Sequence, residues 1–93
     1  MLAACLGRWD DAERHFADAL AMNERLGARP YAVRTRRAWA AMLLDRGAPG
    51  DTVRVKELIA AGLAESGTLG MAREIVRLER LRARMESAQA RRV

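Results

Sequence analysis

The sequence predicts an all-α protein, and three observations support this fold class. First, the 93 residues are 51% hydrophobic, and they include only two prolines, one tyrosine and one phenylalanine. Second, the runs of β-branched and aromatic residues that strands favour are missing. Third, apolar residues recur at steps of three and four positions along most of the chain, as they do on one face of a helix.

Glycine, proline and acidic residues mark where the expected helices begin and end. Gly7 is expected to end a short helix remnant, as a glycine after a helix C-terminus does. Asp10 and Glu13 form a capping signal at the start of the next helix. Gly27 ends that helix, and Pro30 suits the first turn of the one that follows. The expected helical segments cover residues 1–6, 10–26, 30–46, 52–66 and 71–88.

The helix over residues 30–46 is expected at the centre of the structure. Its apolar residues spread over so wide an arc that both sides of the helix require packing partners. We expect this helix and the one before it to bury a shared core. The large residues of that core are Trp9, Phe16, Leu20, Trp39 and Leu43.

The two halves of the chain match at an offset of 43 residues. A period of this length that is filled by two helices is typical of a solenoid, in which helical hairpins bury their faces by stacking. The matched pairs are Gly7 with Gly50, Leu20 with Leu63, Leu26 with Leu69, and Gly27 with Gly70. We therefore expect residues 1–93 to form one helical-repeat domain.

The pattern of Gly7, Trp9, Ala12 and Phe16, followed by Ala19-Leu20, resembles the second half of a tetratricopeptide repeat. In that pattern small residues let paired helices approach closely, and the aromatic residues fill the space between repeats. The resemblance implies antiparallel hairpins stacked as a short right-handed solenoid, with the first helix truncated. It also implies a scaffold for protein–protein interaction.

The stretches from Ala19 to Pro30 and from Ala40 to Asp51 are similar to the C-terminal helical region of large bacterial signalling ATPases, the LuxR-type regulators and cyclase-associated ATPases. This similarity implies a module or fragment of a bacterial signalling or transcription regulator. The sequence contains neither a phosphate-binding loop nor a helix-turn-helix, so neither ATPase activity nor DNA binding is implied. A fragment without an independent role remains an alternative.

No pattern typical of a catalytic, cofactor or metal site is present. His15 is the only histidine, and no nucleophile or carboxylate partner is indicated for it. Cys5 is expected to be a small core residue, and Asp10-Asp11 a helix cap. Gly47-x-x-Gly50 lacks the Lys-Ser/Thr of a phosphate-binding loop. We therefore expect a protein that is not an enzyme and has no cofactor.

Arginine at helical spacing is the sharpest functional signal. The formal net charge is +5, and Lys56 is the only lysine among seventeen basic residues. At the repeat offset, two arginines of the central helix map onto two of the last helix. The resemblance places these positions on the concave groove of a tetratricopeptide solenoid. The five candidate groove residues are Arg34, Arg37, Arg77, Arg80 and Arg84.

A groove of this kind would bind an acidic part of a protein: a carboxylate-rich peptide, a C-terminal carboxylate or a phosphorylated segment. Two alternatives are an ordinary solvated face and nucleic-acid binding through the last helix. High-GC codon usage would also enrich arginine. Uncapped ends of the helical stack would favour self-association. The opening residues are too short for a signal peptide or membrane span, and the single cysteine suits a reducing compartment, so we expect a cytoplasmic location.

Overall fold

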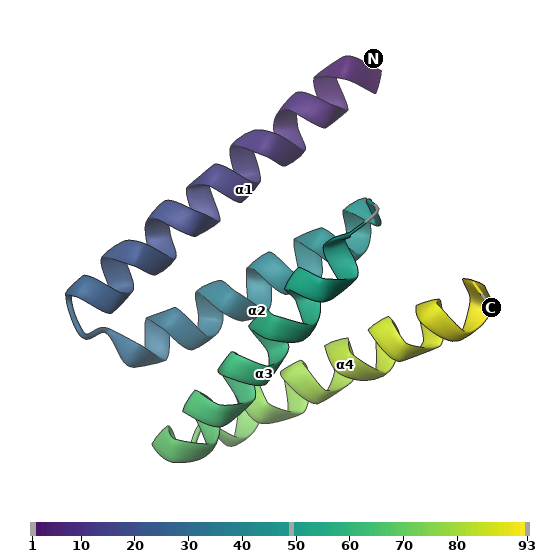
Figure 1. Cartoon of the computed structure of the whole chain (residues 1–93). Helices are drawn as coiled ribbons and strands as arrows, with labels where there is room; N and C mark the ends of the chain where they lie inside the picture. The colour runs from purple at the N-terminus through teal and green to yellow at the C-terminus, as the bar shows by residue number, and fades with distance from the viewer. Residues whose placement is uncertain (1, 49, 93) are drawn as a thin grey trace.

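The computed structural model describes the backbone of residues 2–48 and 50–92 and the side chains of residues 8–48 and 50–90. Over these residues the chain forms four α-helices and no strand (Figure 1), which confirms the all-α class. The helices are α1 (Leu2–Arg25), α2 (Arg29–Arg46), α3 (Asp51–Leu69) and α4 (Ala72–Arg92).

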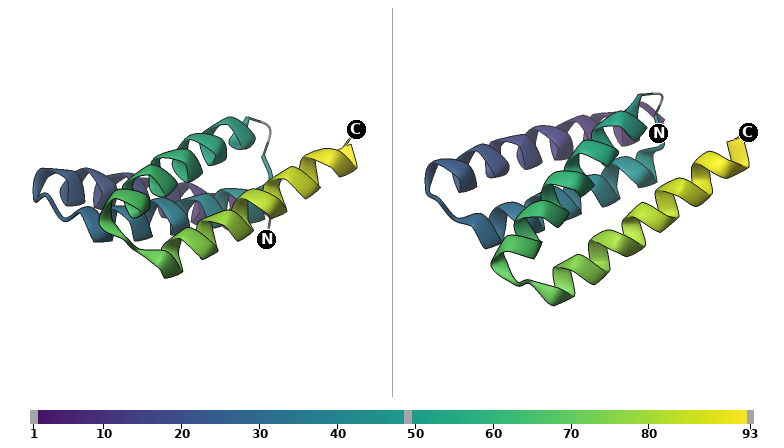
Figure 2. Two further views of the ribbon diagram at one scale, coloured as in Figure 1. Left: turned by 90° about the horizontal axis from the view of Figure 1, so that it is seen from below. Right: turned by 60° about the horizontal axis from the view of Figure 1, so that its bottom comes forward.

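Helix α2 lies at the centre of the arrangement. It contacts each of the other three helices, and α3 contacts α4 as well. Within the described residues α1 contacts α2 alone. Figure 2 shows α3 crossing over α2 while α4 runs along the opposite side of α3 from α1. The molecule is therefore a layered array rather than a closed bundle, with α1 and α4 at its two edges.

The expected helix break at Gly7 is wrong, because α1 continues without interruption from Leu2 to Arg25. The expected cap at Asp10 and Glu13 consequently lies inside a helix. A glycine inside a helix costs only about 1 kcal/mol relative to alanine, which the good helix formers around Gly7 offset. Gly27 does end this helix, and its φ of 68° is a left-handed conformation that glycine adopts without strain.

The remaining helix ends follow local chemistry. Gly47 ends α2 with a left-handed φ of 62°, and its N–H donates to the carbonyl of Leu43 over 2.9 Å. Pro30 lies in the first turn of α2. Helix α3 runs on to Leu69, past the expected end at residue 66. The Ser66 hydroxyl donates to the carbonyl of Gly62 over 2.7 Å, so this buried polar group is satisfied inside the helix.

The core is formed by side chains from α2, α3 and α4. Its buried residues are Trp39, Ala40, Met42, Leu43, Val55, Leu58, Ile59 and Met85. The expectation that the large apolar residues of α1 would be largely buried is wrong, since Trp9, Phe16 and Leu20 are only half-buried against this cluster. The reason is that α1 has a helix on one side only.

In the part of the chain that the structure describes, no helix combines the length and apolar character that crossing a membrane requires.

Candidate acidic-ligand surface

The first residues of α4 and the middle of α2 enclose an open surface pocket of about 570 Å³. Four of its lining residues are arginines, Arg34 and Arg37 from α2 and Arg73 and Arg77 from α4. We call this site the arginine pocket. The remaining lining residues are Met71, Ala72 and Glu74. The pocket lies between α2 and α4, which contact each other, and each helix supplies two of the lining arginines.

Glu74 is the carboxylate inside the arginine pocket, and it is buried. One of its oxygens accepts a hydrogen bond from Nε of Arg37 over 2.6 Å, and the other accepts one from a terminal nitrogen of Arg77 over 3.2 Å. A carboxylate can be buried when it is paired and hydrogen-bonded in this way. Glu74 therefore places a carboxylate between two of the candidate groove residues, Arg37 and Arg77.

The other two arginines of the pocket are more open. Arg34 is exposed, and its guanidinium carbon lies 5.6 Å from the centre of the Tyr31 ring. Arg73 is exposed on the first turn of α4. Among the described side chains, neither residue has a carboxylate within salt-bridge distance. The pocket thus combines two guanidinium groups held by Glu74 with two that face solvent.

Two of the expected groove residues, Arg80 and Arg84, do not line this pocket. Arg84 reaches back to Asp45 of α2 with a distance of 2.5 Å between Nη2 and Oδ1, and both side chains are more than half exposed. Arg80 is exposed on α4. The structure therefore brings Arg34, Arg37 and Arg77 together and leaves the other two outside.

Arg73 and Glu74 are the pocket residues that sequence reasoning left out of the groove. Arg73 stands four residues before Arg77, so it lies on the same helix face and carries a detectable signal. Glu74 stands three residues before Arg77, which is also a pairing distance on a helix. The contact between Glu74 and Arg37 joins two different helices, so the local sequence around either residue does not predict it.

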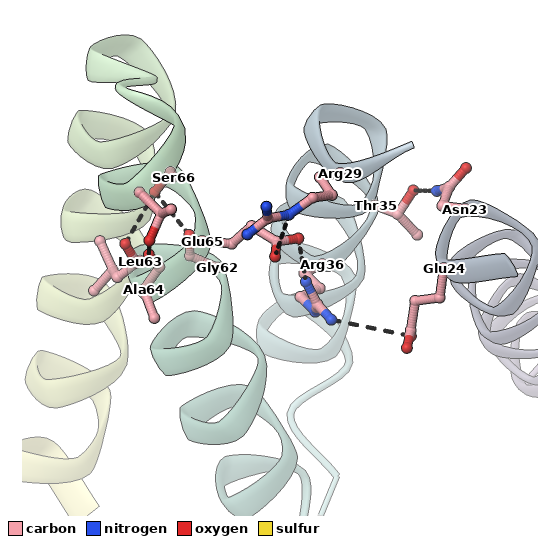
Figure 3. Close-up of polar contacts among 11 residues, drawn as sticks. Asn23, Glu24, Arg29, Thr35, Arg36, Gly62, Leu63, Ala64, Glu65 and Ser66 are labelled. Carbon is pink, nitrogen blue, oxygen red and sulfur yellow. Dashed lines mark hydrogen bonds and ion pairs between the residues drawn. The ribbon is translucent and has the colours of Figure 1, made fainter. Parts of the chain in front are cut away.

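The arginines on the α3-facing side of α2 have carboxylate partners from two other helices. Figure 3 shows Arg36 between Glu65 of α3 and Glu24 of α1, at 3.3 Å and 4.0 Å. Arg29 also reaches Glu65, at 3.3 Å. Asn23 of α1 donates to the hydroxyl of Thr35 over 2.9 Å. These contacts link α1, α2 and α3, and the two glutamates balance the positive charges of Arg29 and Arg36 on this side of α2.

Arg46 at the end of α2 is the most strongly paired arginine. It donates to both carboxylate oxygens of Asp51, over 2.9 Å and 2.7 Å, and to Glu13 of α1 over 3.3 Å. The hydrogen bonds from Arg46 lower the pKa of Asp51 below its usual value, and the bond to Asp51 raises the pKa of Arg46. This cluster joins the C-terminal end of α2 and the first residue of α3 to the middle of α1.

The candidate catalytic and metal-binding groups are not brought together. His15 is exposed on α1, with its ring 6.4 Å from that of Phe16. Among the side chains that the structure describes, no group of three or more His, Cys, Asp or Glu residues is arranged to hold a metal ion. The Cys5 side chain lies outside the described residues.

No known protein family, curated protein or solved structure matches this chain. The site must therefore be interpreted from its own geometry.

Proposed function

We propose that this chain is a non-enzymatic protein-interaction module of tetratricopeptide type that binds acidic segments of a partner. The arrangement of the helices supports the proposal. Helices α2 and α4, which stand one repeat apart in the sequence, contact each other and carry the arginine pocket between them. In a stack of helical hairpins, equivalent helices of successive units line one surface in this way.

The observation that carries the proposal is the charge of the arginine pocket. It places four guanidinium groups around one open concavity with a single carboxylate, Glu74. Elsewhere Arg36 and Arg46 have two carboxylate partners each. Uncompensated guanidinium groups in a concavity favour anionic ligands, because each makes charge-assisted and often bidentate hydrogen bonds.

As part of this proposal, the module serves a cytoplasmic bacterial signalling or transcription regulator, in line with the resemblance of the region from Ala19 to Asp51. The ATPase and DNA-binding activities of such regulators are not proposed for this chain. Its role is to hold a partner protein through the arginine pocket.

The test is binding of a fluorescently labelled acidic peptide, rich in Asp and Glu, measured by anisotropy. The variant Arg34→Gln with Arg73→Gln removes the two open guanidinium groups of the pocket. The matched control, Arg80→Gln with Arg84→Gln, removes two charges from the same surface outside the pocket. Glutamine preserves much of the side-chain stem and the helix propensity.

We expect the pocket variant to weaken binding about tenfold, which corresponds to roughly 1.4 kcal/mol, and the control to change it by less than about twofold. Equal weakening in both variants would contradict a defined site and would indicate general attraction to a basic surface. Tighter binding of single-stranded DNA than of the peptide, with a steep decline in added salt, would favour the nucleic-acid alternative.

A further inference from the structure

The arginine pocket has a net charge that one carboxylate cannot balance. Arg34, Arg37, Arg73 and Arg77 contribute four positive charges, and Glu74 contributes one negative charge, which leaves an excess of three positive charges. The charges are concentrated on the ends of flexible side chains around one opening. A ligand that neutralises this excess with few atoms needs more than one negative charge.

Glu74 orients two of the four guanidinium groups before a ligand binds. It holds Arg37 through Nε at 2.6 Å and Arg77 through a terminal nitrogen at 3.2 Å. A guanidinium has five N–H donors in a planar fork, so each of these groups keeps further donors after binding Glu74. Because the Glu74 side chain is only 7% exposed, it acts as a fixed internal anchor and not as a mobile competitor.

Resting on the proposed function, we infer that the arginine pocket recognises a phosphate monoester, presented as phosphoserine or phosphothreonine in a segment of the partner protein. A phosphate monoester carries roughly −1.5 to −2 charges at pH 7 and three strong acceptor oxygens. A carboxylate carries one charge and two oxygens. The pocket has an excess of three positive charges, and the guanidinium groups of Arg34 and Arg73 face solvent. These features match a phosphate monoester better than they match a carboxylate.

A phosphodiester backbone fits the pocket less well. It carries one charge per phosphate and needs a continuing row of cations along the strand. Arg80 and Arg84 follow Arg77 along α4, but they lie outside the pocket, and Arg84 pairs with Asp45. The arginines of the pocket therefore surround one opening and do not form a row along which a nucleic-acid strand could lie.

The experiment compares three labelled peptides that differ at one position, which is serine, glutamate or phosphoserine. Binding is measured by anisotropy at pH 7.5 and at pH 5.5, with inorganic phosphate as a competitor. Single-stranded DNA of similar length serves as the phosphodiester probe. The proteins are the wild type, Arg34→Gln with Arg73→Gln, and the control Arg80→Gln with Arg84→Gln.

We expect the phosphoserine peptide to bind at least about tenfold more tightly than the glutamate peptide, with inorganic phosphate competing. Its binding should weaken at pH 5.5, because the second phosphate pKa is about 6 and the monoanion then dominates. The preference should disappear in the pocket variant and persist in the control. Circular dichroism establishes that each variant is folded, and Arg73→Gln alone provides a milder change at an exposed position.

The outcomes separate this inference from the proposed function. Equal affinity for the glutamate and phosphoserine peptides, lost in the pocket variant, would overturn the phosphate assignment while the acidic-ligand proposal stands. No binding of either peptide would overturn both. Tighter binding of DNA than of the phosphoserine peptide would also overturn both, and would point to the nucleic-acid alternative.

Discussion

The rings of Phe16 and Trp39 lie nearly parallel, with an angle of 15° between their planes and 6.5 Å between their centres. Phe16 belongs to α1, whereas Trp39 belongs to α2 and is buried. The guanidinium carbon of Arg54 from α3 lies 5.3 Å from the centre of the Trp39 ring. Trp39 is thus a side chain at which α1, α2 and α3 meet, and Phe16 is, with Trp9, an aromatic contact of α1 with the core.

Phe16→Ala should lower the free energy of unfolding by about 2 kcal/mol. Full burial of a phenylalanine makes this change cost roughly 3–5 kcal/mol, and Phe16 is only half-buried. Tyr31→Ala is the control, because Tyr31 is 61% exposed and should matter little. Urea unfolding monitored by circular dichroism measures both. Equal stability of the Phe16 variant and the wild type would mean that α1 does not depend on this stacking.

The Arg46–Asp51 contact should make stability fall in acid. The pKa of Asp51 is lowered in the folded state, so its contribution is fully present above the unfolded-state pKa of about 3.9 and is lost as the pH falls through the lower folded-state value. Asp51→Asn should cost about 1–2 kcal/mol at pH 7 and flatten the stability profile below about pH 4. Urea unfolding at several pH values measures this. The control is Asp18→Asn at an exposed position, which should leave the dependence of stability on pH unchanged. A similar change in both variants would rule out a specific role for Asp51.

Two glycines of α3 should respond differently to alanine. A Cβ added at Gly62 would lie 3.1 Å and 3.2 Å from the two terminal methyl carbons of Leu78, which is fully buried, whereas a Cβ at Gly67 would meet nothing within 4 Å. Gly67→Ala should stabilise by up to about 1 kcal/mol through helix propensity. Gly62→Ala should be about 1–2 kcal/mol less stable than that variant, since overpacking moves α4. Thermal unfolding of the pair decides this, and equal midpoints would contradict the close approach of α3 and α4.

The edges of the helix array should drive self-association. Within the described residues α1 packs on α2 alone, and the nearby Leu26 is 75% exposed. On α4, Val76 is 50% exposed. We expect species larger than a monomer in sedimentation velocity at micromolar concentration. Leu26→Glu and Val76→Glu should each shift the distribution towards monomer. A single monomeric species over the whole accessible concentration range would show that the edges do not associate.

The sequence alone determined the features that depend on neighbouring residues. The spacing of apolar residues indicated helices throughout, because a helical face is defined by positions three and four apart. Gly27 marked a helix end correctly, since its positive φ favours glycine wherever it occurs. The clustering of arginines at the start of the last helix was also detectable, because i,i+4 spacing places Arg73 and Arg77 on one face.

The tertiary structure decided which of these local sequence patterns correspond to a helix end or to a contact between helices. Gly7 had the same local appearance as a terminating glycine, but the helix passes through it. The repeat offset matched Arg34 with Arg77 and Arg37 with Arg80, and so placed all four in one groove. In the structure, the burial of Leu78 and Met85 sets the rotation of α4 so that Arg77 enters the pocket and Arg80 lies outside it. The pairing of Arg37 with Glu74 joins residues of two helices. Such a contact depends on how the helices pack around a common core, and packing is set by the whole chain rather than by any one segment of it.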